Sequence, residues 1–334
     1  MATGRLRRII RRREREVENG ADEFRTIIER MGENIGRRLA ASLNTDPDKV
    51  FPKRGDDGDL IGQTEFERTL IALAPADGEN MTVGEGDRLR AAILSANLEA
   101  VEQLVTAAGM GDGRAALRER VSTLAGLAEA TLTAQGMPGD GIFDTVAAEA
   151  LIEGFANTNI DQVVIRTLTT NTANRIQSSL ISSLATMPVS ELAQTIGERE
   201  SELSNSQAMT EAQTRLAMAD RFLQETARKS IEDDGEFRLL SAYMGARPDG
   251  KIRDFCLHLV GKAFKNEDFD QARNAQLGEH PRISGGGYRC RHYVTPVLDD
   301  DEILEDLDLV RGDMGDIKTA NNAAKSKRKK KRRR

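Results

Sequence analysis

The chain has 334 residues, 39% of them hydrophobic and 4% aromatic, which favours an elongated, mainly helical molecule filled by Ala, Leu, Ile and Val. Its formal net charge of −6 conceals an acidic body with two basic arms: seven arginines lie between residues 5 and 15, and nine basic residues lie among the last ten. The sequence has no run of 18 apolar residues, no apolar leader core and only two cysteines, so it predicts no membrane span, secretory signal or disulfide framework, and a reducing cytoplasm is expected.

Residues 1–43 predict a single basic helix, because apolar side chains recur at three- and four-residue steps from Ile9 to Leu39 while the opposite face is charged. Helix breakers and like charges follow, so residues 44–86 are expected to form a linker with a short helix. Residues 87–234 then predict a helical body. Its apolar periodicity divides it into runs at 87–108, 114–135, 143–156, 160–184, 190–196 and 209–231.

The pattern changes at Gly235, beyond which apolar runs are short and are separated by turn residues such as Arg247-Pro248-Asp249-Gly250. Residues 235–298 therefore predict a small α+β module. Residues 299–334 begin acidic and end in a basic run of low complexity, which we expect to be disordered when free. The predicted fold is mainly α: an elongated helical body, a small C-terminal α+β module and a disordered basic tail.

Every cysteine and histidine of the chain lies within one short window of the predicted module. These residues are Cys256, His258, His280, Cys290 and His292. The two thiolates and two imidazoles would suit a tetrahedral zinc ion with His258 or His280 as its fourth ligand, and the ion would hold together a module too small for a large core. A one-residue spacer is less typical of zinc than a two-residue spacer, so unpaired buried thiols and a disulfide remain alternatives.

Four segments of the module occur in a characteristic order: 247–256 (RPDGKIRDFC), 261–264 (GKAF), 285–292 (GGGYRCRH) and 295–297 (TPV). This order resembles the C-terminal signature of the head morphogenesis, or minor head, proteins of tailed bacteriophages. The helix-rich region upstream, from about residue 160, fits the same arrangement. By resemblance, four residues are expected to fix turns and form ion pairs within the module: Arg247, Asp249, Arg253 and Asp254. Gly261 and Lys262 are also expected to be structural.

The resemblance implies a low-copy, non-enzymatic protein with no catalytic residues and no small-molecule substrate. Its implied partners are the portal protein, the major capsid protein or both, in procapsid assembly and in DNA packaging or delivery. Its implied location is the host cytoplasm during assembly and then the virion, in the capsid interior or at the portal vertex.

The basic ends predict non-specific contact with double-stranded DNA, because Lys and Arg side chains displace counterions condensed on the phosphates. The tail supplies Lys325, Lys327, Arg328, Lys329, Lys330, Lys331, Arg332, Arg333 and Arg334, and the N-terminal helix supplies Arg7, Arg8, Arg11 and Arg12. A solvated tail or a localisation signal is the alternative for the C-terminus. The N-terminal helix would equally suit an acidic protein or a membrane surface.

Two other functions fit parts of this pattern: an ejected DNA-binding virion protein without a role in assembly, and a zinc-dependent nuclease. Catalysis is the least favoured, because Gly285-Gly286-Gly287 lacks the Lys-Ser/Thr of a phosphate-binding loop. The abundant carboxylates also lie in solvated runs such as residues 299–302. Any zinc ion bound by these residues is accordingly expected to be a structural element.

Overall fold

The computed structural model describes residues 2–43, 97–183, 189–232, 236–245, 252–273, 280–286, 290 and 292–331. Contacts divide the chain into two compact units. The sheet unit consists of Met1–Asp22, Ala116–Ile160 and Thr210–Arg334, and the helical unit consists of Glu23–Ala115 and Asp161–Met209. Each unit is therefore assembled from segments that are distant in the sequence.

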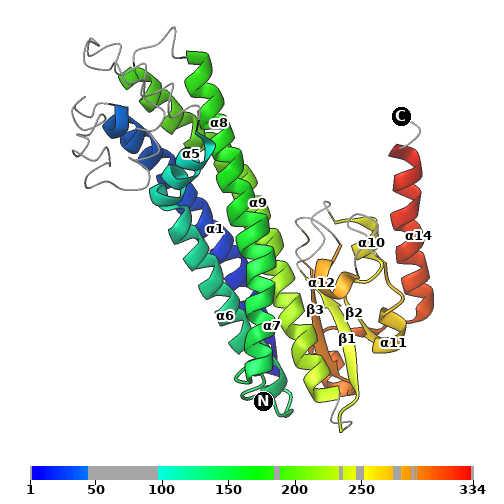
Figure 1. Cartoon of the computed structure of the whole chain (residues 1–334). Helices are drawn as coiled ribbons and strands as arrows, with labels where there is room; N and C mark the ends of the chain where they lie inside the picture. The colour runs from blue at the N-terminus through cyan, green and yellow to red at the C-terminus, as the bar shows by residue number, and fades with distance from the viewer. Residues whose placement is uncertain are drawn as a thin grey trace, which may run out of the picture. The chain divides into compact units, whose positions relative to one another are not determined.

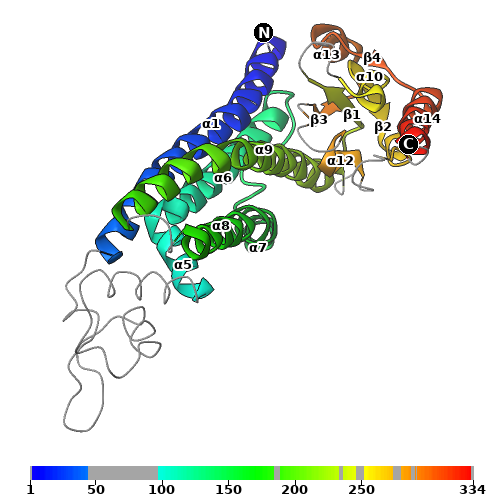
Figure 2. The ribbon, with the colours of Figure 1, turned by 90° about the horizontal axis from the view of Figure 1, so that it is seen from above.

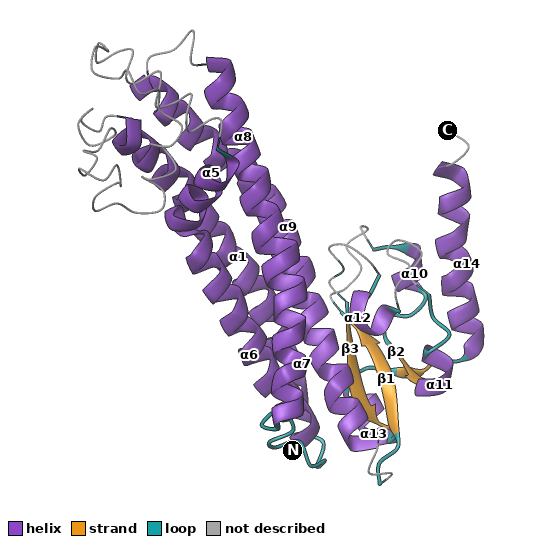
Figure 3. Ribbon diagram, in the orientation of Figure 1, coloured by secondary structure: helices purple, strands orange, loops and turns teal. Residues whose placement is uncertain are grey.

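Helices dominate the described chain before residue 236, as Figure 3 shows in purple. They are α1 (Ala2–Leu43), α5 (Leu98–Val105), η2 (Thr106–Met110), α6 (Gly111–Thr133), α7 (Val146–Ala156), η3 (Asn157–Arg166), α8 (Thr167–Ser183) and α9 (Val189–Glu232). The mainly α prediction is confirmed. Helix α9 is one continuous element where the sequence predicted two runs, because the polar stretch between those runs contains no proline that would end a helix.

The helical unit has its own apolar core. Phe24, Met31 and Ile35 of α1 are fully buried there, as are Val101 of α5 and Ile176 of α8. This burial explains the apolar periodicity that the sequence shows along both α1 and α8, because each stripe is the face that packs inward. The predicted linker at residues 44–86 lies outside the described residues.

The sheet unit carries a four-stranded sheet at its C-terminal end (Figure 1). Its strands are β1 (Leu239–Met244), β2 (Lys262–Lys265), β3 (Tyr293–Leu298) and β4 (Val310–Arg311), in the order β3-β1-β2-β4. Strand β1 pairs antiparallel with β2 and β3, whereas β2 pairs parallel with β4. Short helices connect them: α10 (Asp254–Leu257), α11 (Asn266–Phe269), α12 (Pro281–Ser284) and α13 (Asp301–Asp306), before the longer α14 (Met314–Lys331). The predicted α+β module is confirmed.

Successive side chains of β1 point to opposite faces of the sheet, and those of residues 239–243 are all buried. Both faces of the sheet are therefore covered at β1. Tyr243 belongs to a core that includes Ile317 of α14, together with side chains from α10 and α11. Leu240 belongs to a second core that includes Leu6 and Ile10 of α1. The helix expected at residues 1–43 is present as α1, and its first turns are part of the module's packing.

Helix α14 extends through Lys331, in a segment where the sequence analysis expected disorder. Ala, Lys and Arg all have high helix propensity, so this composition suits a helix as well as a solvated coil. Residues 332–334 lie outside the described part of the chain. Within the described ranges, no helix is both long enough and apolar enough to cross a membrane.

Candidate metal centre

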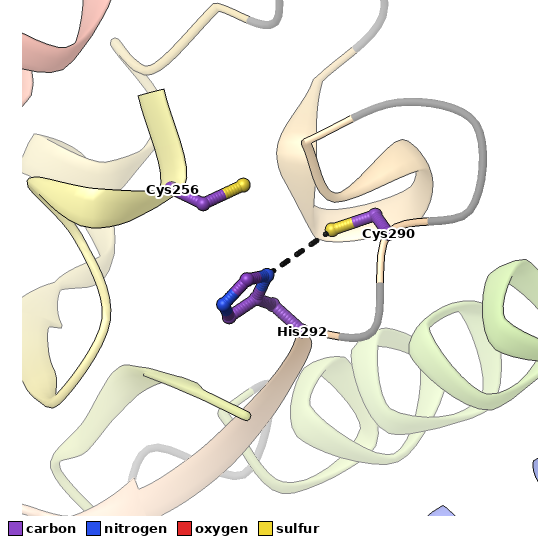
Figure 4. A group of neighbouring side chains, drawn as sticks. All are labelled: Cys256, Cys290 and His292. Carbon is purple, nitrogen blue, oxygen red and sulfur yellow. Dashed lines mark hydrogen bonds between the residues drawn. The ribbon is translucent and has the colours of Figure 1, made fainter. Parts of the chain in front are cut away.

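Cys256, Cys290 and His292 lie together in the interior of the sheet unit, with one ligand atom from each within 4.8 Å of the others. Figure 4 shows the three side chains directed toward a common centre. The Cys290 Sγ lies 3.5 Å from the His292 Nδ1, and both cysteines are free and buried. Three of the five residues predicted as ligands are therefore brought together.

Cys290 and His292 both come shortly before β3, which begins at Tyr293, and the Cys290 Sγ lies near the His292 Nδ1. Cys256 comes from α10, which begins at Asp254, and its Phe255 and Cys256 side chains face the core. Helix α10 and the segment that leads into β3 thus supply the two thiols.

A glycine pair encloses the cysteines. The Gly286 N–H donates to the Cys290 Sγ at 2.9 Å, and a Cβ on Gly286 would overlap the Cys256 Sγ. Gly285 has φ +55°, in the left-handed region, and a Cβ there would lie 2.9 Å from the Cys290 Sγ. Only glycine therefore allows this backbone to pass so close to both sulfurs.

Arg221 of α9 anchors the two segments that flank Cys290. Its Nε donates to the Ile283 carbonyl at 2.9 Å and its Nη1 donates to the His292 carbonyl at 3.2 Å. The side chain is buried, and Figure 2 shows α12 beside the C-terminal part of α9. This anchoring fixes the backbone on both sides of the thiol, as the second shell of a metal site does.

The pKa values of the two thiols are shifted in opposite directions. Hydrogen bonding from Cys256, with His292 and the Arg221 guanidinium adding to it, holds the pKa of Cys290 well below its ordinary value although burial opposes the shift. The same hydrogen bond, together with burial, raises the pKa of Cys256. A thiolate at Cys290 is the form that a soft cation binds.

His258 and His280 lie outside this centre, so the expected set of two cysteines and two histidines is corrected. His280 caps α12: its Nδ1 accepts from the Arg282 N–H at 3.1 Å, and its Nε2 bonds the Phe269 carbonyl at 3.0 Å. With both ring nitrogens engaged, it has none left for a metal. His258 is the C-cap of α10, where it is only partly buried and lies near Asp316.

The three side chains could hold a metal ion. Zinc prefers thiolate and imidazole ligands, and the structure supplies two sulfurs and one ring nitrogen in a buried pocket. The Nδ1 of His292 is the ring nitrogen that faces the Cys290 Sγ, whereas its Nε2 is buried and has no hydrogen-bond partner among the described residues. No described disulfide joins the cysteines, so the reduced pair is the form available to a metal.

No protein-family model, curated protein or solved structure matches this chain.

The residues expected to be structural have different outcomes. Gly261 has φ +79° and donates its N–H to the Tyr243 carbonyl at 2.9 Å, and Lys262 pairs with Asp316 of α14 at 2.5 Å, so both residues make structural contacts. Arg253 is the N-cap of α10 and Asp254 its first residue. Two further residues, Arg247 and Asp249, lie outside the described residues.

The basic residues predicted to contact DNA differ in their exposure to solvent. Arg8, Arg11 and Arg12 are exposed on α1, whereas Arg7 is partly buried and pairs with Asp308 at 3.3 Å. Arg15, which the sequence analysis did not select, is exposed on the same helix. Of the predicted tail, residues 325–331 belong to α14, but their side chains lie outside the described part of the structure.

Proposed function

We propose that this chain is a minor head protein of a tailed bacteriophage that acts with the portal or major capsid protein in procapsid assembly and in DNA packaging or delivery. One observation carries the proposal. The described parts of the four segments that resemble the family signature belong to one folded module: Cys256 and Cys290 pack in the core of Tyr243, Gly261 bonds to the Tyr243 carbonyl, and residues 295–297 form part of β3. Motifs that share one structural unit are expected of a domain signature.

The exposed arginines of α1 support DNA contact. Arg8, Arg11, Arg12 and Arg15 recur at steps of three and four residues, so they lie along one side of the helix. Arg12 is 62% exposed and its ion pair with Glu16 is long, at 3.8 Å. Such a row of arginines can contact the phosphates of DNA, and these contacts do not depend on base sequence.

We also propose that zinc is held by Cys256, Cys290 and His292 as a structural element of the module. The ion would join α10 to the start of β3, two segments that otherwise meet only through side-chain packing and hydrogen bonds. Metal binding to a preformed site adds its free energy to folding. A non-enzymatic role needs no more from the ion than this.

Co-expression with portal, scaffold and capsid proteins tests the assembly role. We expect the full chain to enter purified procapsids, and a chain truncated after Ala324 to enter them equally well but to retain less DNA. Loss of incorporation on truncation would favour an ejected DNA-binding protein. Absence of the full chain from every particle would overturn the proposal.

DNA contact is tested by measuring affinity against salt concentration. Each phosphate contact contributes a slope of about 0.9 in log K against log salt, so changing Arg8, Arg11, Arg12 and Arg15 to Gln should reduce the slope by up to about 3 to 4. Arg7→Gln is the matched control, because Arg7 already pairs with Asp308. An unchanged slope in the four-residue variant would show that this face of α1 does not contact DNA.

Metal content tests the zinc site. We expect about one zinc per chain in the wild type, a loss in Cys256→Ser and no loss in His258→Asn, which changes a histidine outside the centre. A wild type free of zinc after expression in zinc-supplemented medium would contradict the proposal. Plasmid cleavage in Zn²⁺ or Mg²⁺ that disappears in His292→Ala would instead indicate a nuclease.

A further inference from the structure

The hydroxyl of Tyr243 lies at the metal centre. Tyr243 is fully buried in the central strand β1, and its hydroxyl is 3.3 Å from the Cys256 Sγ and 3.7 Å from the Cys290 Sγ. Among the described residues, these sulfurs are the only hydrogen-bond partners of that oxygen. Thiol sulfur is a weak acceptor, so the hydroxyl is poorly satisfied for a fully buried group.

The distances match the edges of a zinc tetrahedron. Zinc lies about 2.3 Å from sulfur and about 2.0–2.1 Å from nitrogen or oxygen, so neighbouring ligand atoms are separated by about 3.3–3.8 Å. The two distances from the Tyr243 oxygen to sulfur are 3.3 and 3.7 Å, and the Cys290 Sγ to His292 Nδ1 distance is 3.5 Å. Three of the six edges of a tetrahedron, both sulfur edges of the phenolic oxygen among them, thus have the lengths expected around zinc.

The surrounding structure fixes this oxygen in place. Tyr243 pairs with Lys262 on one side and with Val294 on the other, so its backbone is held by both neighbouring strands. Its ring stacks on the His292 ring, with centroids 5.4 Å apart and planes 17° apart. A side chain held by a sheet and by ring stacking is preorganised for a ligand position.

We propose that the phenolic oxygen of Tyr243 is the fourth ligand of the zinc ion, which gives a centre of two cysteines, one histidine and one tyrosine. The inference rests on the zinc site proposed above. On binding, the O–H bond of Tyr243 breaks, its proton passes to solvent buffer and the oxygen donates its lone pair to zinc.

The competing arrangement is a water ligand with Tyr243 as a hydrogen-bond donor to a thiolate. Such a water has a route, because Cys290 and His292 also line a cavity bordered by Arg13, Asp220 and Tyr293. The two arrangements differ in the protonation state of the phenol. Burial, with the nearby Cys290 and Cys256 adding to it, raises the pKa of Tyr243, so the phenol keeps its proton at neutral pH when no metal is bound.

Zinc titration of chelator-treated full-length protein separates these arrangements. We expect the near-ultraviolet difference band of tyrosinate to grow with zinc and to saturate at one ion per chain. In Tyr243→Phe the band should vanish, the zinc affinity should fall at least about 10-fold, and one fewer proton should be released per zinc, measured calorimetrically in buffers of different ionisation enthalpy. Tyr293→Phe is the matched control and should retain the band.

Each other outcome is decisive. If zinc binds the wild type without a tyrosinate band, Tyr243 is not a ligand, and that result needs no variant to fold. If Tyr243→Phe binds zinc with unchanged affinity and proton release, the inference also fails while the zinc site stands. If no zinc binds the wild type, the zinc proposal itself fails.

Discussion

At the scale of single residues, Arg13 shows how position changes the role of a charge. It belongs to the arginine-rich segment of α1, but it is only 2% exposed. Its guanidinium donates twice to the Asp220 carboxylate, at 2.8 Å each, and once to the Thr295 hydroxyl at 3.1 Å. One side chain therefore connects α1, α9 and β3 within the sheet unit.

We predict that Asp220→Asn destabilises the protein by about 3–5 kcal/mol, because it leaves a buried guanidinium without its countercharge. The double variant Arg13→Met/Asp220→Leu should recover most of this loss, since neither charge remains. Urea unfolding of Arg13→Met, Asp220→Leu and the double variant measures the coupling. Arg12→Met, which removes an exposed arginine of the same helix, should stay within about 0.5 kcal/mol of the wild type.

His280 leads to a prediction about pH. Burial lowers its pKa, with Arg282 and Arg273 adding to the effect and the Phe269 carbonyl and Asp270 opposing it. The unfolded chain therefore takes up a proton near the ordinary value of about 6.5, while the folded chain does so only at lower pH. Stability should fall as pH decreases from about 6.5 toward the folded pKa.

The variant His280→Asn tests this, because asparagine can still accept from the Arg282 N–H and does not titrate. Free energies of unfolding measured from pH 8 to 5 should show a smaller acid loss in the variant, while other titrating groups contribute equally to both proteins. Parallel pH profiles for the two proteins would exclude His280 as the cause.

The residues of the centre also show what sequence reasoning can reach. Cys256, Cys290 and His292 were found because their side-chain types are rare and concentrated. Arg221 and Tyr243 were missed, because an arginine on a long helix and a tyrosine in an apolar strand carry no local mark of the site they reach. The run of three glycines at residues 285–287, shortly before Cys290, was the sequence signal for a backbone that passes close to the thiols.

At the scale of elements, the edge of β3 is closed by a side chain. Gln135, 8% exposed, donates to the Pro296 carbonyl at 3.1 Å and accepts from the Leu298 N–H at 3.0 Å. It thus pairs with β3 as a neighbouring strand would, and Pro296 is tolerated because it lies on an edge strand. The glutamine follows α6, so a helix end protects the sheet.

We predict that Gln135→Leu destabilises the protein by about 2–4 kcal/mol, because a backbone donor and a backbone acceptor lose their partners in a buried place. The amide of Leu298 should exchange with deuterium faster, which hydrogen exchange followed by mass spectrometry measures. Gln103→Leu, at an exposed position on α5, should change neither quantity. Equal protection of Leu298 in both variants would contradict the role given to Gln135.

Element types followed from periodicity, whereas partners did not. The stripes of α1 and α8 and the short apolar run of β1 predicted helices and a strand correctly, because local burial repeats with the geometry of each element. Which faces meet was not predictable, since Leu6 and Ile10 pack against a sheet more than 200 residues later in the chain. The periodicity of apolar residues shows which face of an element is buried, but it does not show which other element packs against that face.

At the scale of the whole molecule, only one of the two units contains cysteine and histidine side chains that could bind a metal. All cysteines and histidines of the chain lie between residues 256 and 292, within the sheet unit, so the helical unit contains none. The sequence divided the chain into consecutive domains, but helices α1 and α9 each contribute residues to both units. Any effect of zinc on stability should therefore begin in one unit only.

We predict that zinc raises the melting temperature of the sheet unit and leaves that of the helical unit nearly unchanged. A ligand at about 1,000 times its dissociation constant adds about 4 kcal/mol, and in a unit of this size each kcal/mol raises the melting temperature by about 2–4 °C, so the shift should be roughly 8–16 °C. Calorimetry with zinc and with chelator measures both transitions. Ile317→Ala and Ile176→Ala identify them, because each residue is fully buried in one unit. Cys256→Ser should abolish the shift, and a zinc-dependent rise in the transition that Ile176→Ala lowers would contradict a metal centre confined to the sheet unit.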